Sequence, residues 1–167
     1  AGLLENQLHG QLRWKEFPKD AASVKSASAF ALIDADANFS WDLLTAGEST
    51  AFHPTTNPDA GVVQFLDSKP LAEEAATGLL TWDFDNDGYL DALTWNESTL
   101  TALRGGPLGL FKPAPELTTK LPSNIVGCDV ADLDADGDLD LAVACVDSIQ
   151  VVSNEGGNAN HWIDVPI

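Results

Sequence analysis

The chain has 167 residues, of which 26 are Asp or Glu and only 8 are Lys or Arg, so its formal net charge is −18. Binding to nucleic acid needs a basic surface, and this composition excludes it as an expected function. Hydrophobic residues make up 44% of the chain, which is typical of a folded protein, and no apolar run is long enough to span a membrane.

Three acidic segments occur along the chain at equal intervals. They are DADANFSWD (34–42), DFDNDGYLD (83–91) and DLDADGDLD (132–140), and each begins 49 residues after the one before. Mainly apolar stretches of strand length precede and follow each segment, such as TGLLTW before the second and ALTW after it. This pattern predicts an all-β chain made of three repeats.

The repeats define the expected domain organisation. We expect one repeat-built β domain over residues 1–167, with repeat cores at about 25–50, 74–99 and 123–150. Connections rich in Gly and Pro predict turns and further short strands. A helical pattern occurs in KPLAEEAATG at 69–78, for which a short helix is the prediction.

The acidic segments share the pattern D-x-[DN]-x-[DN]-x-x-x-D, which predicts a calcium loop. Alternating carboxylates in a tight turn face one hard cation, the backbone carbonyl at the seventh place adds an oxygen, and Gly at the sixth place permits a positive φ. Without a cation, so many carboxylates would repel one another or have raised pKa values. The predicted ligands are Asp83, Asp85, Asp87, the carbonyl of Tyr89 and Asp91 in the second segment, and Asp132, Asp134, Asp136, the carbonyl of Asp138 and Asp140 in the third.

The first segment departs from this pattern, because Asn38 is at the fifth place and Phe39 is where Gly is expected. A bulky side chain at positive φ is unfavourable. Asp34, Asp36, Asn38 and Asp42 still offer four ligands, so the sequence leaves open whether this segment binds calcium.

Other metal sites fit these segments less well. Helix-flanked EF-hand and dockerin loops usually carry an acidic residue at the twelfth place, whereas this place holds Thr45, Thr94 and Val143, inside the apolar stretches. Zinc prefers Cys and His ligands, and magnesium keeps more water and takes fewer protein oxygens. Each calcium loop is therefore expected to connect two adjacent strands.

With these residues, the chain resembles the FG-GAP or VCBS repeats of integrin-α-like β-propellers, whose blades carry D-x-D-x-D-G-x-x-D calcium loops between their first strands. The resemblance covers residues from about 25 to 150, and its most specific parts are the segments 83–91 and 132–140. It implies a propeller of four-stranded blades, structural calcium, an exported location, and a role in recognition or cell adhesion. Residues 154–167, NEGGNANHWIDVPI, also resemble the start of an ASPIC/UnbV module.

Three repeats are too few for a closed propeller, which usually has about four to eight blades. Because the chain begins with Ala1 and contains no Met, we expect it to be a segment of a longer protein. Self-association that completes a propeller, or a fourth unit built from residues 3–17 and the C-terminal tail, are the alternatives.

The cysteines and tryptophans leave alternatives open. Cys128 and Cys145 flank the third segment as near cross-strand neighbours, so they form either a disulfide or two buried thiols. The five tryptophans are expected mainly in the core, because Trp41, Trp82 and Trp95 lie in or beside strand-like stretches, although exposed rings would suit a sugar-binding face.

The sequence favours a calcium-binding scaffold in an extracellular or periplasmic location, with a protein or carbohydrate partner and no enzymatic activity expected. The aspartates come in equivalent sets, whereas a glycosidase needs one carboxyl with a raised pKa and another held ionised. The alternatives are a domain of a polysaccharide-acting enzyme of the lyase type and a lectin.

Overall fold

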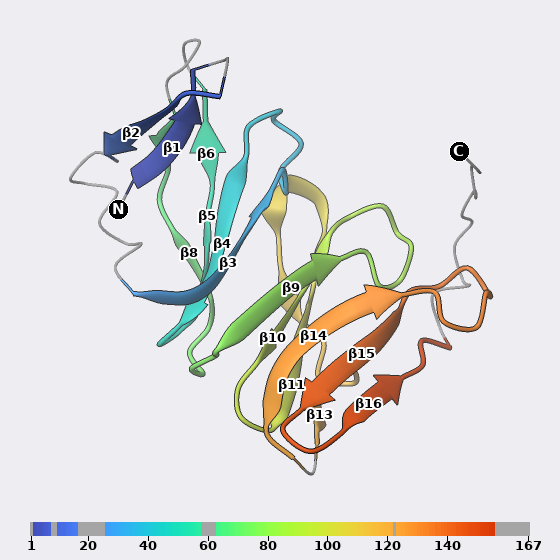
Figure 1. Cartoon of the computed structure of the whole chain (residues 1–167). Coiled ribbons are helices and arrows are strands. Elements are labelled where there is room, and N and C mark those ends of the chain that lie inside the picture. Colours follow the sequence, from blue (N-terminus) through green and yellow to red (C-terminus); the bar gives the residue numbers. More distant parts are fainter. Residues whose placement is uncertain (1, 8–9, 17–25, 58–62, 122, 156–167) are drawn as a thin grey trace.

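The computed structural model describes residues 2–7, 10–16, 26–57, 63–121 and 123–155. Within these residues the chain forms antiparallel sheets, loops and one short 3-10 helix, which confirms the predicted all-β fold. Figure 1 shows three larger sheets following one another in chain order, from cyan through green to orange. In this described part, no helix has the length and apolar character needed to cross a membrane.

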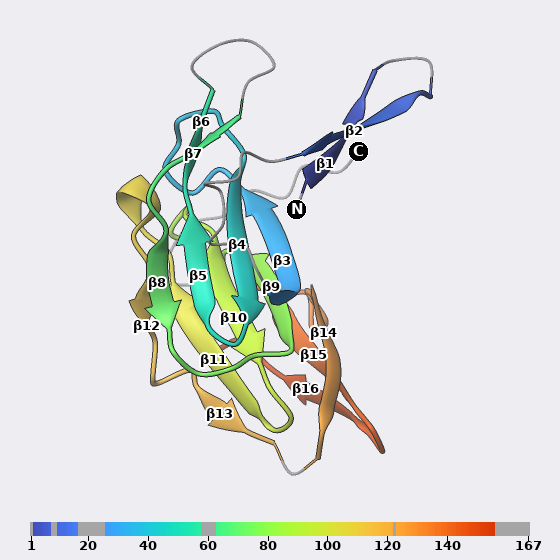
Figure 2. The same ribbon diagram turned by 90° about the vertical axis from the view of Figure 1, so that its left-hand side faces the viewer.

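The first sheet has the strand order β3-β4-β5-β8. Its strands are β3 (Ala27–Ile33), β4 (Asp42–Gly47), β5 (Thr50–His53) and β8 (Lys69–Ala72). A short hairpin of β6 (Thr55–Thr56) and β7 (Gln64–Phe65) lies between β5 and β8 in the chain. Figure 2 shows the first sheet face-on, with the second sheet behind it.

The second sheet has the order β9-β10-β11-β12, with β13 also pairing with β11, and the third has the order β14-β15-β16. Their strands are β9 (Gly78–Trp82), β10 (Asp91–Trp95), β11 (Thr99–Arg104), β12 (Lys112–Pro113), β13 (Thr119–Lys120), β14 (Ile125–Ala131), β15 (Asp140–Cys145) and β16 (Ile149–Val152). The 3-10 helix η1 (Pro107–Gly109) follows β11, and an N-terminal hairpin pairs β1 (Gly2–Asn6) with β2 (Leu12–Glu16).

The sheets pack on one another through two apolar clusters. Between the first and second sheets, Leu44 and Phe52 pack with Ala92 and Leu103. Between the second and third sheets lies a larger cluster, whose buried members are Phe84, Leu93, Leu100, Ala102, Ala114, Ile125, Leu141, Val143 and Cys145. Burying one such Leu or Phe contributes about 1.5–3 kcal/mol relative to exposure. The sheets therefore form an open series in which each covers the next, and β9 contacts both β3 and β14.

The short helix predicted at 69–78 is wrong, because Lys69–Ala72 forms strand β8. This strand pairs with β5, where Ala51 faces Pro70 and Thr50 faces Ala72. β8 is the edge strand of the sheet, a position where proline is tolerated because no further strand needs its missing N–H. Sheet pairing thus outweighs the local helical propensity of the segment.

The tryptophans divide between core and surface. Trp82 and Trp95 pack against the cluster between the second and third sheets, as predicted. Trp41 is 68% exposed and Trp14 is 55% exposed, so the expected core position is wrong for these two. Trp41 is the last residue of the first acidic loop, directly before β4 begins at the buried Asp42, so it lies outside the buried strand. Trp162 lies outside the described residues.

Both cysteines are free thiols. Cys128 pairs with Val143 and Cys145 pairs with Ile125, so the two thiols are diagonal neighbours and not directly opposite. Burial raises the pKa of Cys128 to about 12, and the nearby Cys145 adds to this effect. The two side chains therefore act as small apolar groups of the core.

Candidate metal centres

Each acidic segment connects the first strand of a sheet to the second. The residue before the segment pairs with the aspartate at its ninth place, and the three pairs are Ile33 with Asp42, Trp82 with Asp91, and Ala131 with Asp140. The three loops therefore begin and end at equivalent points of their hairpins. This is the connection of adjacent strands that the sequence predicts.

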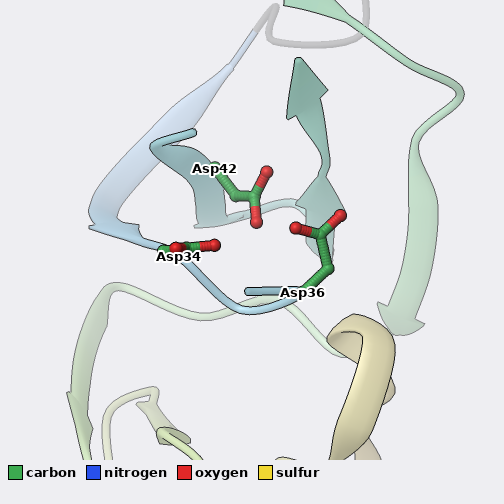
Figure 3. Close-up of side chains that lie close together, drawn as sticks. All are labelled: Asp34, Asp36 and Asp42. Atoms are coloured by element: carbon green, nitrogen blue, oxygen red, sulfur yellow. The ribbon is translucent and has the colours of Figure 1, made fainter. Parts of the chain in front are cut away.

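The first loop brings three carboxylates together. Asp34, Asp36 and Asp42 each offer one oxygen atom, and these oxygens lie within 4.8 Å of one another. Figure 3 shows the three side chains pointing toward a common space, two from the loop and one from the start of β4. A space lined by carboxylate oxygens suits a hard cation such as calcium.

The other two loops contain comparable clusters, with oxygens within the same 4.8 Å of one another. In the second loop the cluster uses the first, third and ninth places, whereas in the third loop it uses the first, third and fifth. The members are Asp83, Asp85 and Asp91 in the second loop and Asp132, Asp134 and Asp136 in the third. Two other predicted side-chain ligands, Asp87 and Asp140, do not belong to these clusters. Asn38 lies beside the first cluster, because its Nδ2 donates a hydrogen bond to Asp36 Oδ2 at 3.1 Å. Tyr89 and Asp138 are predicted to contribute only backbone carbonyls.

The aspartate at the first place organises the backbone of its own loop. Asp83 Oδ1 accepts a hydrogen bond from the N–H of Asp87 at 3.1 Å, and Oδ2 accepts one from Gly88 at 2.8 Å. The equivalent bonds run from Asn38 and Phe39 to Asp34, both at 3.1 Å, and from Asp136 and Gly137 to Asp132, both at 3.2 Å. The carboxylate thus turns the loop around itself, which brings the other acidic side chains close to it.

The side chain at the fifth place closes a smaller turn by accepting a hydrogen bond from the N–H at the seventh place, as Asn and Asp commonly do in turns. The three bonds run from Ser40 to Asn38 at 2.7 Å, from Tyr89 to Asp87 at 2.8 Å and from Asp138 to Asp136 at 3.0 Å. Only Asp136 also places its carboxylate in the cluster of its loop.

The aspartate at the ninth place is buried and binds two backbone N–H groups. Asp91 Oδ2 accepts a hydrogen bond from Phe84 at 2.8 Å, and Oδ1 accepts one from Gly105 at 2.6 Å. The equivalent donors are Ala35 and Thr55 to Asp42, at 3.1 and 2.7 Å, and Leu133 and Asn154 to Asp140, at 3.0 and 2.9 Å. Each carboxylate therefore ties its loop to the end of the third strand of its sheet.

Burial changes the acidity of two of these aspartates. Burial raises the pKa of Asp91 to about 7, and the carboxylates of Asp85 and Asp83 add to this effect, whereas the backbone hydrogen bonds oppose it. Burial also raises the pKa of Asp42. Such shifts arise where a buried negative charge is not fully compensated, and a bound dication would compensate it.

The backbone donors that follow the third strand of each sheet were not predicted from the sequence; they are Thr55, Gly105 and Asn154. Of the three, only Gly105 is distinctive in the sequence. A glycine is required there, because a Cβ would collide with the backbone carbonyl of Leu90. Thr55 and Asn154 donate through their backbone N–H groups, which every residue except proline possesses. Their side chains therefore gave no indication of this role.

The second and third loops also contact each other. Asn86 Nδ2 donates a hydrogen bond to Asp138 Oδ1 at 3.0 Å, and the Asp138 side chain is fully buried. Asn154 Nδ2 donates to the carbonyl of Phe84 at 2.8 Å, while its N–H binds Asp140. The side chain of Asp138 thus links two loops, a role that the sequence did not indicate.

Arg104 distinguishes the second loop from the other two. Its Nε lies 2.8 Å from Asp85 Oδ2, and its Nη1 lies 3.3 Å from Glu116. Pro54 and Ser153 occupy the equivalent places, directly before Thr55 and Asn154, and carry no charge. The guanidinium reduces the repulsion among the carboxylates of this loop, and a metal ion would share Asp85 with it.

The loop turns require positive φ at two places. The sixth-place residues Phe39, Gly88 and Gly137 have φ of 64°, 90° and 96°, which confirms the expected conformation at this place. The fourth-place residues Ala37, Asn86 and Ala135 also have positive φ, at 58°, 54° and 62°, which the sequence did not indicate. Phe39 is 94% exposed, so its ring avoids collisions while its backbone keeps an unfavourable conformation.

One family model matches part of the chain. Residues 83–143 match the family model described as an FG-GAP-like repeat, a range that includes the second and third loops and the strands between them. The resemblance predicted from the sequence is confirmed for these residues. No curated protein and no solved structure matches the chain. The matched range ends before residues 154–167, so the resemblance to an ASPIC/UnbV module stays a prediction, and residues 156–167 lie outside the described residues.

We expect Phe39→Gly to raise the free energy of unfolding by about 1 kcal/mol. The substitution removes a cost of about 1–3 kcal/mol for a non-glycine residue at positive φ, and the greater freedom of glycine in the unfolded chain offsets about 0.4–1 kcal/mol of this gain. Urea unfolding measures the difference. Gly88→Ala is the matched control and is expected to lose about 1 kcal/mol, because an added Cβ meets no atom within 4 Å and only the backbone conformation opposes it. A less stable Phe39→Gly variant would show that the ring contributes packing.

We expect Asp140→Asn to lower the free energy of unfolding by about 1–3 kcal/mol even in the presence of a chelator. An amide has one accepting oxygen, so either Leu133 or Asn154 loses its buried acceptor. Chemical unfolding in chelator measures this loss, and Asp67→Asn on the exposed surface is the control. Unchanged stability in chelator would mean that Asp140 acts only through a metal.

Proposed function

We propose that this chain is a calcium-binding segment of propeller-type repeats that serves as an extracellular or periplasmic binding scaffold, with calcium in a structural role. The observation that carries this proposal is the occurrence of one loop geometry three times. Each loop joins the first two strands of a sheet, has first- and ninth-place aspartates that accept the same backbone hydrogen bonds, and gathers three carboxylate oxygens within 4.8 Å.

Calcium is the cation that fits these loops best. The donors are carboxylate oxygens on an irregular loop, which suits the flexible coordination of calcium better than the strict octahedron of magnesium. No Cys or His belongs to any of the three clusters, and zinc usually takes such ligands. In each loop, the three clustered carboxylates would hold one ion, and backbone carbonyls of the same loop would add further oxygens. The first loop is included, because its cluster forms despite Phe39.

The scaffold role is supported by the architecture and by the family match. The sheets pack in series around apolar clusters, and residues 83–143 match an FG-GAP-like repeat, whose family resemblance implies exported recognition or adhesion proteins. The loops lie at the ends of hairpins, where a bound ion would fix two strands without forming part of a reactive site. We therefore propose that calcium stabilises the protein and takes no part in catalysis.

Calcium is expected to raise the melting temperature of chelator-treated protein, because an ion that binds only the folded state stabilises it by about 2.7 kcal/mol at a concentration of 100 times Kd. Calorimetric titration is expected to give three equivalents. Asp36→Ala, Asp85→Ala and Asp134→Ala each remove a third-place carboxylate from one cluster, so each is expected to reduce the stoichiometry by one.

Glu48→Ala is the control for this titration, because Glu48 is exposed and lies outside the loops. It is expected to keep both the stoichiometry and the calcium-dependent shift in melting temperature. A melting curve that calcium and chelator leave unchanged would contradict the proposal. Two equivalents in the parent protein, unchanged in Asp36→Ala, would restrict binding to the second and third loops.

Carbohydrate binding is the second candidate function, and the exposed aromatic rings of the first loop favour it. Phe39 is 94% exposed and Trp41 is 68% exposed, so both rings are available for stacking on a sugar. We expect a neutral oligosaccharide that binds here to change the tryptophan fluorescence of the parent protein but not of Trp41→Ala. Trp14→Ala is the matched control, because Trp14 is also exposed but lies on the N-terminal hairpin. A response that survives Trp41→Ala would contradict this site.

A further inference from the structure

The second loop has a positive charge beside it at a position where the other two loops have none. Arg104 is the last residue of β11 and directly precedes Gly105, whose N–H binds the ninth-place Asp91. The residues at the equivalent position of the other two sheets are Pro54 and Ser153. The sheet therefore brings a basic side chain to the acidic cluster of the second loop and to no other at this position.

Arg104 forms an ion pair with a member of this cluster. Its Nε lies 2.8 Å from Asp85 Oδ2, and the two side chains are 42% and 25% exposed. Asp85 belongs to the three carboxylates of the second loop whose oxygens lie within 4.8 Å of one another. Because an arginine stays protonated in proteins, the same carboxylate that would bind a metal ion already has a permanent cation as its partner.

The guanidinium has two further partners that do not belong to the cluster. Its Nη1 lies 3.3 Å from Glu116 Oε1, and its central carbon lies 5.4 Å from the centroid of the Phe84 ring. The residues equivalent to Phe84 in the other loops are Ala35 and Leu133, which have no ring. Arg104 can therefore leave Asp85 and still keep a carboxylate and an aromatic face as partners.

A calcium ion and the guanidinium oppose each other at Asp85. Positive charges a few ångströms apart repel, and this repulsion is stronger at a partly buried site than in bulk water. Calcium therefore binds the second loop either against this repulsion or after the ion pair between Arg104 and Asp85 has broken. Both routes weaken binding, and the third loop bears neither cost at this position, because Ser153 carries no charge.

We propose that Arg104 is an internal competitor of calcium, so that the second loop fills only after the third. This inference rests on the proposed calcium binding and adds an order of occupancy to it. In the calcium-free protein, Arg104 compensates the charge of Asp85. When calcium binds, the guanidinium leaves Asp85 and is retained by Glu116 and Phe84. Arg104 thus sets the affinity of the site without being a ligand.

Such an order would divide the calcium response between two loops that contact each other. Asn86 of the second loop and Asp138 of the third are joined by a hydrogen bond of 3.0 Å. The third loop would hold its ion at low calcium concentration, whereas the second would do so only at a higher concentration. The boundary between the second and third sheets would therefore be completed in two steps.

The test is calorimetric titration with calcium of two chelator-treated variants that each keep one of these clusters. Asp36→Ala/Asp134→Ala retains the second cluster and is called the second-loop protein, whereas Asp36→Ala/Asp85→Ala retains the third and is called the third-loop protein. The second-loop protein is expected to bind calcium about tenfold more weakly than the third-loop protein. Adding Arg104→Gln is expected to strengthen binding by the second-loop protein about tenfold, because the competing charge is removed.

Two further substitutions in the second-loop protein separate the charge from other effects. Arg13→Gln is the matched control, because Arg13 also forms an exposed ion pair, with Glu5 at 3.6 Å, but lies on the N-terminal hairpin. It changes the net charge equally and is expected to alter the affinity less than about twofold, since salt screens distant charges. Arg104→Lys keeps a positive charge and is expected to retain most of the weakened affinity.

Each outcome bears on the proposal. If Arg104→Gln changes the affinity of the second-loop protein no more than Arg13→Gln does, the proposal is overturned while calcium binding itself stands. Equal affinities for Arg104→Lys and Arg104→Gln would also overturn it, because packing and not charge would then be responsible. A parent chain that binds no calcium would contradict the proposed function and this inference together. Far-UV circular dichroism verifies that every variant remains folded.

Discussion

The structure of each repeat depends on one buried carboxylate at the ninth place of its loop. This group accepts one N–H from the loop and one from the end of the third strand, so it fixes three parts of a sheet at one point. A charged acceptor makes these hydrogen bonds stronger than neutral ones, but its burial is costly unless the charge is compensated. Burial accordingly raises the pKa values of Asp91 and Asp42, because it disfavours their charged forms.

The loops combine a common frame with different surroundings. Arg104 places a positive charge beside Asp85 in the second loop, while Asp138 of the third loop accepts a hydrogen bond from Asn86 of the second. The first loop has neither feature and contains Phe39 in a backbone conformation that favours glycine. The three loops therefore differ in the groups that surround their carboxylates, and such differences would tune the affinity of each loop for a cation.

The sequence was sufficient for features that repeat and insufficient for those that arise from packing. The spacing of 49 residues predicted the strands on either side of each loop, and the aspartate pattern predicted that carboxylates gather in each loop, although Asp87 and Asp140 do not belong to the clusters. The strand at Lys69–Ala72 was missed because its pairing with β5 is a tertiary contact that local propensity does not encode. Asn86 and Asn154 were missed for the same reason, since both link the second loop to the third repeat and depend on how the sheets stack.

The first sheet also shows where a repeat can change length. Three residues separate the paired Ala46 and Thr50 in the turn from β4 to β5, whereas four separate Trp95 and Leu100 in the second sheet. The one-residue deletion leaves the loop at the other end unaltered, because Thr55 still reaches Asp42 as Gly105 reaches Asp91. Insertions and deletions between related repeats should therefore accumulate in this distal turn, away from the acidic loops.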